Sequence, residues 1–481
     1  MALYTVIFQP EGISLQVPEG SSLLQAQITA GLHPDAPCGG KGTCGKCRVR
    51  LDGRDVLSCQ KRVDRDMEIF TGAAETVNVL TAGLQLPVQP DGTDDYVLAF
   101  DIGTTTVVAY LMDGHTGTLL VQESCMNPQT QFGADVISRI QYALKTDSGE
   151  MSACIRSVME ELANRAAQKA GIALADITAS AVVGNTAMHH LMLDIDPKPL
   201  VTPPYMPRVS AAMEKNGARI LPNIAGFVGG DTVGCMAATR FDRQEGVNLL
   251  IDIGTNGEMV LGNKKRRIAC STAAGPAFEG AKISCGMRGA EGAVDHVTME
   301  NGALQYHVLG DVPPEGLCGS GLLDLVAALL DLGVIEASGR MKGKQYTLCE
   351  NVVLTQKDVR EVQLAKAAIC AGIELLAERM GVQMEDIQKV YLAGAFGNFM
   401  NPASACRIGM IPPVLLDKIV PVGNAAGEGA KLCALSWEEF VNTQHLAEET
   451  EFLELASLPD FQKRYLAALD FEKNDQKKRS S

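Results

Sequence analysis

Four cysteines in the first 60 residues have the spacing of an iron–sulfur ligand set. Five residues separate Cys38 from Cys44, two separate Cys44 from Cys47, and eleven separate Cys47 from Cys59. A [2Fe–2S] cluster needs four thiolates that converge on one compact unit, two on each iron. We therefore predict that these four cysteines bind a [2Fe–2S] cluster.

Glycines in the same loop favour this interpretation over a zinc site. They lie at positions 39, 40, 42 and 45, where a backbone with positive φ can turn its N–H groups toward bridging sulfides. Zinc usually takes cysteine pairs separated by two to four residues, and only Cys44 and Cys47 form such a pair. The region resembles the ferredoxin domains that are fused to redox enzymes.

The tetrapeptide Asp-Ile-Gly-Thr occurs twice, about 150 residues apart, each time between two apolar runs. A tight glycine-containing hairpin lets backbone N–H groups and Thr hydroxyls surround phosphate oxygens. An Asp at the end of the preceding strand is placed to hold Mg²⁺ or its water shell, so we expect Asp101 and Asp252 to be catalytic. The alternative is two plain β-hairpins. The other predicted phosphate-binding residues are Gly103, Thr104, Thr105, Thr106, Gly254, Thr255 and Asn256.

The predicted elements divide the chain into units. Two strands, a helix and a third strand open it, in the ββαβ order of a β-grasp domain, at Tyr4–Gln9, Ile13–Val17, Leu23–Ala30 and Arg48–Leu51. The stretch LPVQPDGTDD has no helical or strand period and is typical of a linker. We predict a ferredoxin-like domain at 1–72, a linker at 73–95, an ATPase domain at 96–470 and a charged tail at 471–481.

The two hairpins belong to a longer repeated design. Both consist of an apolar strand, Asp-Ile-Gly-Thr, a polar turn and a second apolar strand, which indicates an internal duplication. Helical segments are expected between and after them, including Met151–Ala170 and Val359–Met380.

The paired hairpins resemble the phosphate motifs of the ASKHA superfamily, which includes acetate and sugar kinases, the 70-kDa heat-shock proteins and actin. The resemblance implies an α+β and α/β chain: a β-grasp ferredoxin domain, then a two-lobed, actin-like or ribonuclease H-like ATPase domain. Two later glycine-rich turns, at 390–398 and 422–429, resemble its adenosine-binding lobe, although ordinary strand-to-helix turns are the alternative. The nucleotide-binding residues that this implies are Gly394, Ala395, Phe396, Gly397, Gly423, Asn424 and Gly427.

A ferredoxin domain joined to such an ATPase resembles the reductive activators of corrinoid proteins. Longer members of that family carry an extra segment between the two parts, whereas here the linker leads almost directly into Asp101. Five further stretches share the resemblance: NPQTQFGADVISRI at 127–140, FVGGDTVGCMAA at 227–238, AGPAFEGAKISCGM at 274–287, CGSGLLDLVAALL at 318–330 and LTQKDVREVQLAKAAI at 354–369.

The resemblance implies that ATP drives an electron from the [2Fe–2S] cluster to the Co(II) form of a corrinoid protein in a methyltransferase system, which regenerates Co(I). ATP and Mg²⁺ are the other expected cofactors, and we expect a homodimer through the ATPase domain. The upstream electron donor is not defined. Three alternatives remain open: an ATP-dependent activator of another low-potential enzyme, such as a 2-hydroxyacyl-CoA dehydratase or a benzoyl-CoA reductase, a redox-regulated small-molecule kinase, and an ATP-gated redox sensor.

Several other residues have two interpretations. Asp231 follows two glycines at an expected strand-to-helix turn, where it could position Mg²⁺ or water, or cap the helix. Glu279 and Lys282 lie at an expected helix start and face either nucleotide or solvent. The pair His189-His190 is more often a packed pair than a metal site. A second cluster would require Cys270, Cys285 and Cys318 to converge.

Bulk properties exclude some classes of partner. The net charge of −15 argues against nucleic acid, because phosphate backbones require clustered Lys and Arg. No apolar run approaches the ~20 residues that a membrane helix needs, and the N-terminal residues predict a strand rather than a signal peptide. Fourteen cysteines without disulfides fit a cytoplasmic enzyme.

Overall fold

The computed structural model describes residues 2–32, 34, 36, 40, 42, 47–71, 88–133, 135–146, 149–254, 256–280, 282–300 and 302–471. Four of the expectations above therefore lie wholly or partly outside the described residues. They concern Cys38 and Cys44, the predicted linker over 73–87, Thr255, and the tail from residue 472 onward.

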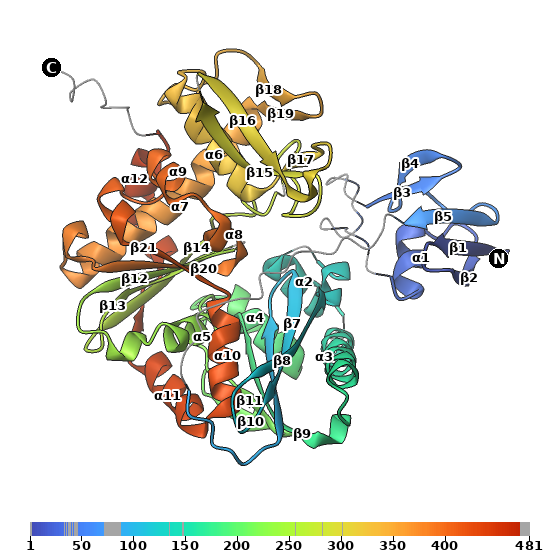
Figure 1. Cartoon of the computed structure of the whole chain (residues 1–481), viewed down its shortest axis with the longest axis horizontal. Helices are drawn as coiled ribbons and strands as arrows, with labels where there is room; N and C mark the ends of the chain where they lie inside the picture. The colour runs from blue at the N-terminus through green and yellow to red at the C-terminus, as the bar shows by residue number, and fades with distance from the viewer. Residues whose placement is uncertain are drawn as a thin grey trace.

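The N-terminal domain is a five-stranded sheet with one helix packed on it (Figure 1). Its strand order is β2-β1-β5-β3-β4, with β1 parallel to β5 and antiparallel to β2. This is a β-grasp arrangement, as expected, but it has two strands, β4 and β5, beyond the predicted ones. The elements are β1 (Leu3–Gln9), β2 (Ile13–Pro18), α1 (Leu23–Thr29), β3 (Arg48–Leu51), β4 (Arg54–Leu57) and β5 (Met67–Thr71).

The first lobe of the larger region is a six-stranded sheet of order β10-β11-β9-β6-β7-β8. Its strands are β6 (Tyr96–Ile102), β7 (Thr106–Asp113), β8 (Leu119–Met126), β9 (Ile177–Gly184), β10 (Met213–Lys215) and β11 (Ala218–Ile220). The second lobe is another six-stranded sheet, of order β21-β20-β12-β13-β14-β22. Its strands are β12 (Asn248–Ile253), β13 (Gly257–Gly262), β14 (Arg267–Thr272), β20 (Lys389–Ala393), β21 (Ile419–Gly423) and β22 (Thr450–Phe452).

The two sheets share one connectivity, so the duplication extends well beyond the hairpins. Each begins with three antiparallel strands and continues through a long helix, α3 (Gly149–Ala170) or α7 (Gln356–Met380). The chain then returns to a strand parallel to the first one, as β9 beside β6 and β20 beside β12. The helix α7 begins three residues before the predicted Val359, because Thr355 and Asp358 form a capping box there.

Both faces of the first sheet are buried, which explains its nearly continuous apolar strands. Alternate residues of β6 point to different cores: Leu98 and Phe100 join the α3 side, while Val97 and Ala99 face the other lobe. Between the two sheets lie α5 (Gly230–Ala238) and α10 (Ala425–Leu435), each of which follows the last parallel strand of its lobe (Figure 1). The lobes are therefore joined through one shared hydrophobic core.

The remaining elements lie outside the three sheets described above. They are α2 (Val136–Ala143), α4 (Thr186–Leu193), β15 (Ala293–Glu300), β16 (Ala303–Val308), β17 (Gly316–Leu317), α6 (Gly319–Asp331), β18 (Gln345–Cys349), β19 (Val352–Thr355), α8 (Gly394–Phe399), α9 (Pro402–Arg407), α11 (Trp437–Glu448) and α12 (Pro459–Ala467). Short 3₁₀ helices occur at Pro128–Gln131, Leu174–Asp176, Lys198–Val201, Phe241–Arg243, Leu309–Asp311, Met384–Asp386, Pro413–Lys418 and Leu455–Ser457.

Two local expectations differ from the structure. The segment that contains Glu279 forms turns rather than the start of a helix, because Gly280 has φ +75° and a backbone N–H bond from Gly280 to Ala277 closes a tight turn. The turn before Asp231 does not follow a regular strand. It follows an isolated bridge between Ala225 and Val228.

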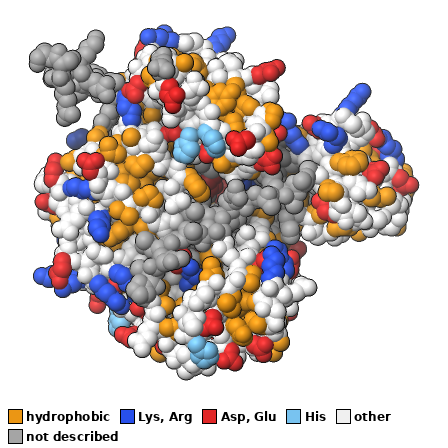
Figure 2. Space-filling model, in the orientation of Figure 1, with side chains coloured by type: hydrophobic (Ala, Val, Ile, Leu, Met, Phe, Trp, Pro, Cys, Tyr) orange, Lys and Arg blue, Asp and Glu red, His pale blue; other side chains and the backbone are white. Residues whose placement is uncertain are grey.

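The surface agrees with the acidic composition. Figure 2 shows Lys and Arg interspersed with Asp and Glu over the visible face of the described residues, rather than gathered into one basic surface. Across the part of the chain that the structure describes, no helix has the length and apolar character needed to cross a bilayer.

Candidate functional site

The first Asp-Ile-Gly-Thr segment is a tight hairpin between β6 and β7. Its turn is closed by a hydrogen bond from the Gly103 N–H to the Thr106 carbonyl, at 2.9 Å. The Thr104 hydroxyl accepts a hydrogen bond from Asn185 Nδ2, at 3.1 Å, and Asn185 also caps α4. The four residues from Gly103 to Thr106 are half-buried, so one side of the hairpin stays accessible.

Asp101, at the end of β6, is held by a residue more than 300 positions away. Asn424 Nδ2 donates to Asp101 Oδ2 at 2.8 Å and lies 2.9 Å from the Tyr110 hydroxyl. Asn424 Oδ1 in turn accepts from the Gly427 N–H, at 3.0 Å, which caps α10. The second glycine-rich turn thus lies next to the first phosphate hairpin. It is held there because α10, which begins after Asn424, packs between the lobes.

The second hairpin connects β12 to β13 and positions Asp252. The Gly254 N–H donates to the Asn256 carbonyl at 2.9 Å, and Cys235 Sγ of α5 lies 3.8 Å from Asp252 Oδ2. A Cβ atom at Gly394 would lie 2.7 Å from Asp252 Oδ1, and Gly394 has φ +84°. Only glycine therefore lets the start of α8 approach this carboxylate so closely.

Half-buried carboxylates near these hairpins lie close enough for their charges to act on one another. Burial raises the pKa of Asp101 and of Asp252 to about 6, and the charge of Asp101 adds to the effect on Asp252. Burial also raises the pKa of Asp231, as do the charges of Asp252 and Asp101. The structure thus brings all three predicted catalytic aspartates into one electrostatic cluster, which a bound cation would stabilise.

Glu258 belongs to the same cluster, although it was not among the site residues predicted from the sequence. Burial, together with the charges of Asp231 and Asp252, raises its pKa well above the usual value. Its Cα pairs directly with that of Asp252 across β12 and β13. A charged residue in an otherwise apolar strand is a signal that could have identified it.

The first glycine-rich turn leads from β20 into α8. Gly394 begins the helix and Ala395 follows it. The Phe396 ring stacks on Phe278, with ring centroids 4.6 Å apart and planes 9° from parallel. Gly397 packs against Leu392, and a Cβ atom added at Gly397 would meet Leu392 at ordinary contact distances. Gly423, at the end of β21, has φ +64° and directs the chain into α10.

The described half of the cysteine loop suits a cluster ligand set. Cys47 and Cys59 are both buried in one small apolar group with Leu24, and the Ser58 N–H donates to the Cys47 carbonyl at 2.7 Å. A Cβ atom at Gly40, which has φ +80°, would lie 3.1 Å from Leu24 and 3.8 Å from the Cys59 Cβ. The backbone at Gly40 thus passes close to Cys59, as wrapping a [2Fe–2S] unit requires.

His189 and His190 are a packed pair. The His190 Nδ1 lies 2.8 Å from the Thr186 carbonyl, and its Nε2 accepts from the Arg208 N–H at 3.1 Å. Both nitrogens of His190 are therefore engaged within the protein. Among the described residues, no three His, Cys, Asp or Glu side chains are arranged to hold a metal ion by themselves.

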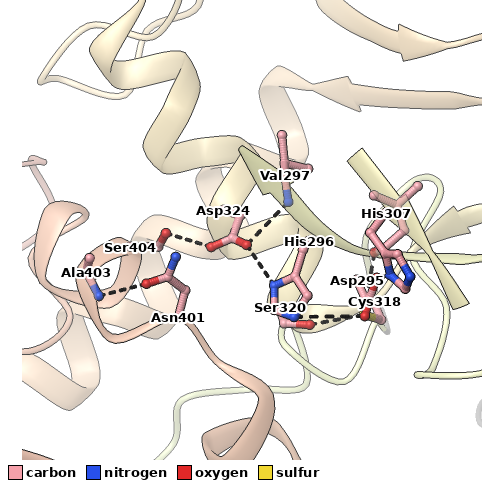
Figure 3. A network of polar contacts seen from close by, with 11 residues as sticks. Asp295, His296, Val297, His307, Cys318, Ser320, Asp324, Asn401, Ala403 and Ser404 are labelled. Atoms are coloured by element: carbon pink, nitrogen blue, oxygen red, sulfur yellow. Dashed lines mark hydrogen bonds and ion pairs between the residues drawn. The ribbon is translucent and has the colours of Figure 1, made fainter. Parts of the chain in front are cut away.

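A separate polar network fixes part of the second lobe (Figure 3). Asp324 of α6 accepts from the Ser404 hydroxyl of α9 at 2.6 Å and from the Val297 N–H of β15 at 3.3 Å, and its carboxylate lies 3.2 Å from His296 Nδ1. Cys318 lies in this network, where its Sγ contacts the Ser320 hydroxyl at 3.3 Å. Its surroundings indicate packing rather than a second cluster.

Comparisons with known proteins cover most of the chain in three segments. Residues 6–73 match the family described as the 2Fe-2S iron-sulfur cluster binding domain. Residues 96–244 match the RACo middle region, and residues 246–481 match the C-terminal domain of RACo, the ASKHA domain. The fold and the site thus define an iron–sulfur protein with a nucleotide-binding ASKHA domain.

Full-length relatives make the family specific. The chain is 32% identical to the corrinoid activation enzyme RamQ of Eubacterium limosum, across 96% of this chain and 98% of that protein. It is 27% identical to the [Co(II) methylated amine-specific corrinoid protein] reductase of Methanosarcina barkeri, across 78% and 77% of the two chains. A solved reductive activator for corrinoid, iron-sulfur protein matches with a TM-score of 0.72 and 29% identity, across 97% and 98%.

The chain belongs to the family of reductive activators of corrinoid proteins. It carries a [2Fe–2S] domain and an ASKHA ATPase domain, and it is an ATP-dependent iron–sulfur oxidoreductase. The alignment to RamQ runs over 581 positions, more than this chain has, so RamQ contains segments that are absent here.

Proposed function

We propose that the protein transfers one electron from its [2Fe–2S] cluster to the Co(II) form of a corrinoid protein of a methyltransferase system, and that ATP hydrolysis drives this step. The product is the Co(I) corrinoid that accepts methyl groups. The observation that carries the proposal is the presence in one chain of the adjacent, buried Cys47 and Cys59 and a duplicated lobe pair with a cluster of interacting carboxylates. The names of RamQ and of the Methanosarcina barkeri reductase support it.

ATP is needed because of the direction of electron flow. Each 30 mV by which a one-electron acceptor lies below its donor costs roughly 0.7 kcal/mol, half of the two-electron value. A [2Fe–2S] cluster of low potential is still a marginal donor for Co(II). Coupling to ATP hydrolysis supplies the missing free energy, which neither a ferredoxin nor an ATPase could provide alone.

We assign the cluster to Cys38, Cys44, Cys47 and Cys59, and Mg²⁺ with the nucleotide phosphates to Asp101, Asp252 and Asp231. When bound, the cluster supplies a one-electron carrier, and Mg²⁺ neutralises phosphate charge. The raised pKa values of the three carboxylates support the second assignment, because a cation would offset their mutual repulsion. The residues around the two hairpins and the two glycine-rich turns would contact the nucleotide.

Closure of the two lobes would couple hydrolysis to electron transfer. Asn424 begins α10, which follows the last parallel strand of the second lobe, and its amide is bonded to Asp101 of the first lobe. A nucleotide at Asp101 would therefore act on both lobes at once and favour one of two arrangements.

We further propose that the functional units are 1–72, 73–95, 96–470 and 471–481, and that the protein acts as a homodimer through its ATPase domain. The ranges of the family matches support the first division. No disulfide joins any two of the twelve described cysteines, which supports a cytoplasmic location.

An anaerobic spectrophotometric assay tests this function. The reduced protein is mixed with a Co(II) corrinoid protein from the same organism, with ATP and Mg²⁺. Co(I) absorbance should appear with ATP, and it should be absent without ATP, with a non-hydrolysable analogue, or with the Cys44→Ser variant. Equal reduction with and without ATP would overturn the proposal, and a phosphorylated small-molecule product would favour a redox-regulated kinase.

A further inference from the structure

A buried polar segment lies directly behind the first phosphate hairpin. It includes Asn127, at the end of β8, and Arg139, in α2, and both side chains are completely buried. Arg139 is one of the largest fully buried side chains of the described chain. The function described so far uses neither residue.

Together these two residues bind three consecutive carbonyl groups of the hairpin. Asn127 Nδ2 donates to the Gly103 carbonyl at 2.7 Å, and Arg139 Nη2 donates to the Thr104 carbonyl at 2.5 Å. The backbone N–H of Asn127 donates to the Thr105 carbonyl at 2.8 Å. The back of the hairpin is therefore fixed at every peptide group from Gly103 to Thr105.

Fixing these carbonyls also fixes the N–H groups on the opposite side. In a planar trans peptide, the carbonyl of one residue and the N–H of the next point in opposite directions. The carbonyls of Gly103 and Thr104 thus determine where the N–H groups of Thr104 and Thr105 point. Within the described part of the chain, neither of these two N–H groups has a hydrogen-bond acceptor.

The side chains behind the hairpin are themselves held in place. Arg139 Nε donates to the Gly133 carbonyl at 2.9 Å, and Arg139 Nη1 contacts Met188 Sδ at 3.4 Å. Asn127 Oδ1 accepts from the Gln129 N–H at 2.9 Å. Because each donor group has a defined partner, the three carbonyls are held by a rigid frame.

Arg139 also adds positive charge behind the hairpin. Among the described residues it forms no ion pair with a carboxylate, and its hydrogen bonds go to backbone carbonyls and a thioether. Burial lowers its pKa to about 10, so it remains a cation at neutral pH. The charge of Asp135 favours this cation without forming an ion pair with it, and an anion that binds nearby would stabilise it further.

We propose that Asn127 and Arg139 are positioning residues for the nucleotide phosphates: by fixing three carbonyls they aim the N–H groups of Thr104 and Thr105 into the cleft as a preformed anion site. This inference rests on the proposed function, because it assumes that ATP binds at this hairpin. Such successive free N–H groups form a concave anion site. In the second hairpin, the corresponding closing hydrogen bond runs from the Gly254 N–H to the Asn256 carbonyl.

The test is calorimetric titration of ATP and of adenosine, each with Mg²⁺, into the full chain. Arg139→Met and Asn127→Ala should each weaken ATP binding by about tenfold or more, because charge-assisted phosphate contacts are lost or misaligned. Binding of adenosine should stay within about twofold, since it has no phosphate. Arg139→Lys should fall between, because lysine keeps the charge but lacks the planar fork.

Arg267→Met is the matched control. Arg267 is also buried and bonded to backbone carbonyls, but it lies on β14 and pairs with Glu449. It should leave the ratio of ATP to adenosine affinity unchanged. If Arg139→Met does not fold, Arg139→Lys and Asn127→Ala decide the matter.

The two hypotheses fail in different ways. Absence of ATP binding by the unmodified protein would refute the proposed function. Normal ATP binding by the unmodified protein, with the same affinity ratio in the folded Arg139 and Asn127 variants, would overturn the positioning role alone.

Discussion

Gly234 in α5 and Gly429 in α10 lie backbone against backbone between the two lobes. A Cβ atom at Gly429 would lie 2.2 Å from the carbonyl oxygen of Gly234. The two helices follow equivalent strands of the duplicated lobes, so this contact lies near the pseudosymmetric centre of the ATPase region. It sets how closely the lobes approach, and it keeps Asn424 within reach of Asp101.

Replacing Gly429 by Ala should therefore destabilise the junction of the lobes. Overpacking a well-packed site costs about 1–3 kcal/mol, and here the obstacle is backbone rather than a movable side chain. Urea unfolding followed by the fluorescence of Trp437, the single tryptophan, measures the effect, because α11 packs beside α10. Gly372→Ala is the control: its Cβ would meet side chains, the flexible end of Met259 and the Thr272 methyl group, rather than backbone. An equal loss in the two variants would argue against a special role for the crossing.

Either Asp101→Asn or Asp252→Asn should lower the ATPase kcat by at least about 100-fold, or ~2.7 kcal/mol in activation free energy, while the iron content is unchanged. The reason is that both carboxylates belong to the buried cluster assigned to Mg²⁺. Phosphate release by the purified variants is the measurement. Glu123 of β8 is a buried carboxylate that pairs with Arg165 and Lys169 of α3, so Glu123→Gln should retain kcat. Normal turnover in both Asp variants would show that the nucleotide is not bound at these two hairpins.

Cys44→Ser should abolish the reducible [2Fe–2S] signal and leave ATP binding intact, since three thiolates cannot complete the coordination of the two irons. Iron analysis and EPR of the dithionite-reduced protein provide the readout. Cys154→Ser, at a half-buried thiol of α3, should leave both unchanged. Full iron content and an unaltered spectrum in Cys44→Ser would refute the four-cysteine assignment.

The contribution of His189 to the stability of the protein should fall in mild acid. Burial, with the neighbouring His190, lowers its pKa to about 3. The unfolded chain therefore binds a proton below pH 6.5 that the folded chain rejects, so stability present above pH 6.5 is lost as the pH falls toward 3. The loss should approach ~1.4 kcal/mol per pH unit.

Urea unfolding at pH 7 and pH 5 measures this dependence. The contribution of His189 to the difference between the two pH values should be lost in His189→Gln. It should persist in His115→Gln, because His115 is exposed and the hydrogen bond to Asp95 raises its pKa instead. A pH difference that is unchanged by His189→Gln would assign the acid sensitivity to other groups.

Local sequence signals predicted much of the fold and part of the site. The two Asp-Ile-Gly-Thr hairpins, the β-grasp opening and the strand-to-helix turns depend on neighbouring residues, and the structure contains them. Strand β4 was missed although Asp52 and Gly53, both with positive φ, form the turn that leads into it. Short strands with charged residues carry little periodic signal.

Long-range contacts in the site were beyond such signals. Asn424 was predicted to bind nucleotide, but its bond to Asp101 spans 323 residues and depends on α10 packing between the lobes. Arg139 lies 35 residues from Thr104 and has an ordinary helical pattern around it. Its burial follows only from the folded arrangement of α2, and a lone arginine in a helix more often faces solvent.

A single-turnover measurement tests the central claim most directly. The cluster is reduced anaerobically, excess reductant is removed, and the protein is mixed with a Co(II) corrinoid protein before freezing for EPR. With ATP and Mg²⁺, we expect the reduced-cluster and Co(II) signals to disappear together, one cluster electron for each cobalt, and without ATP both should persist. Persistence of both signals with ATP, or equal loss of both without any nucleotide, would contradict ATP-driven reduction of the corrinoid.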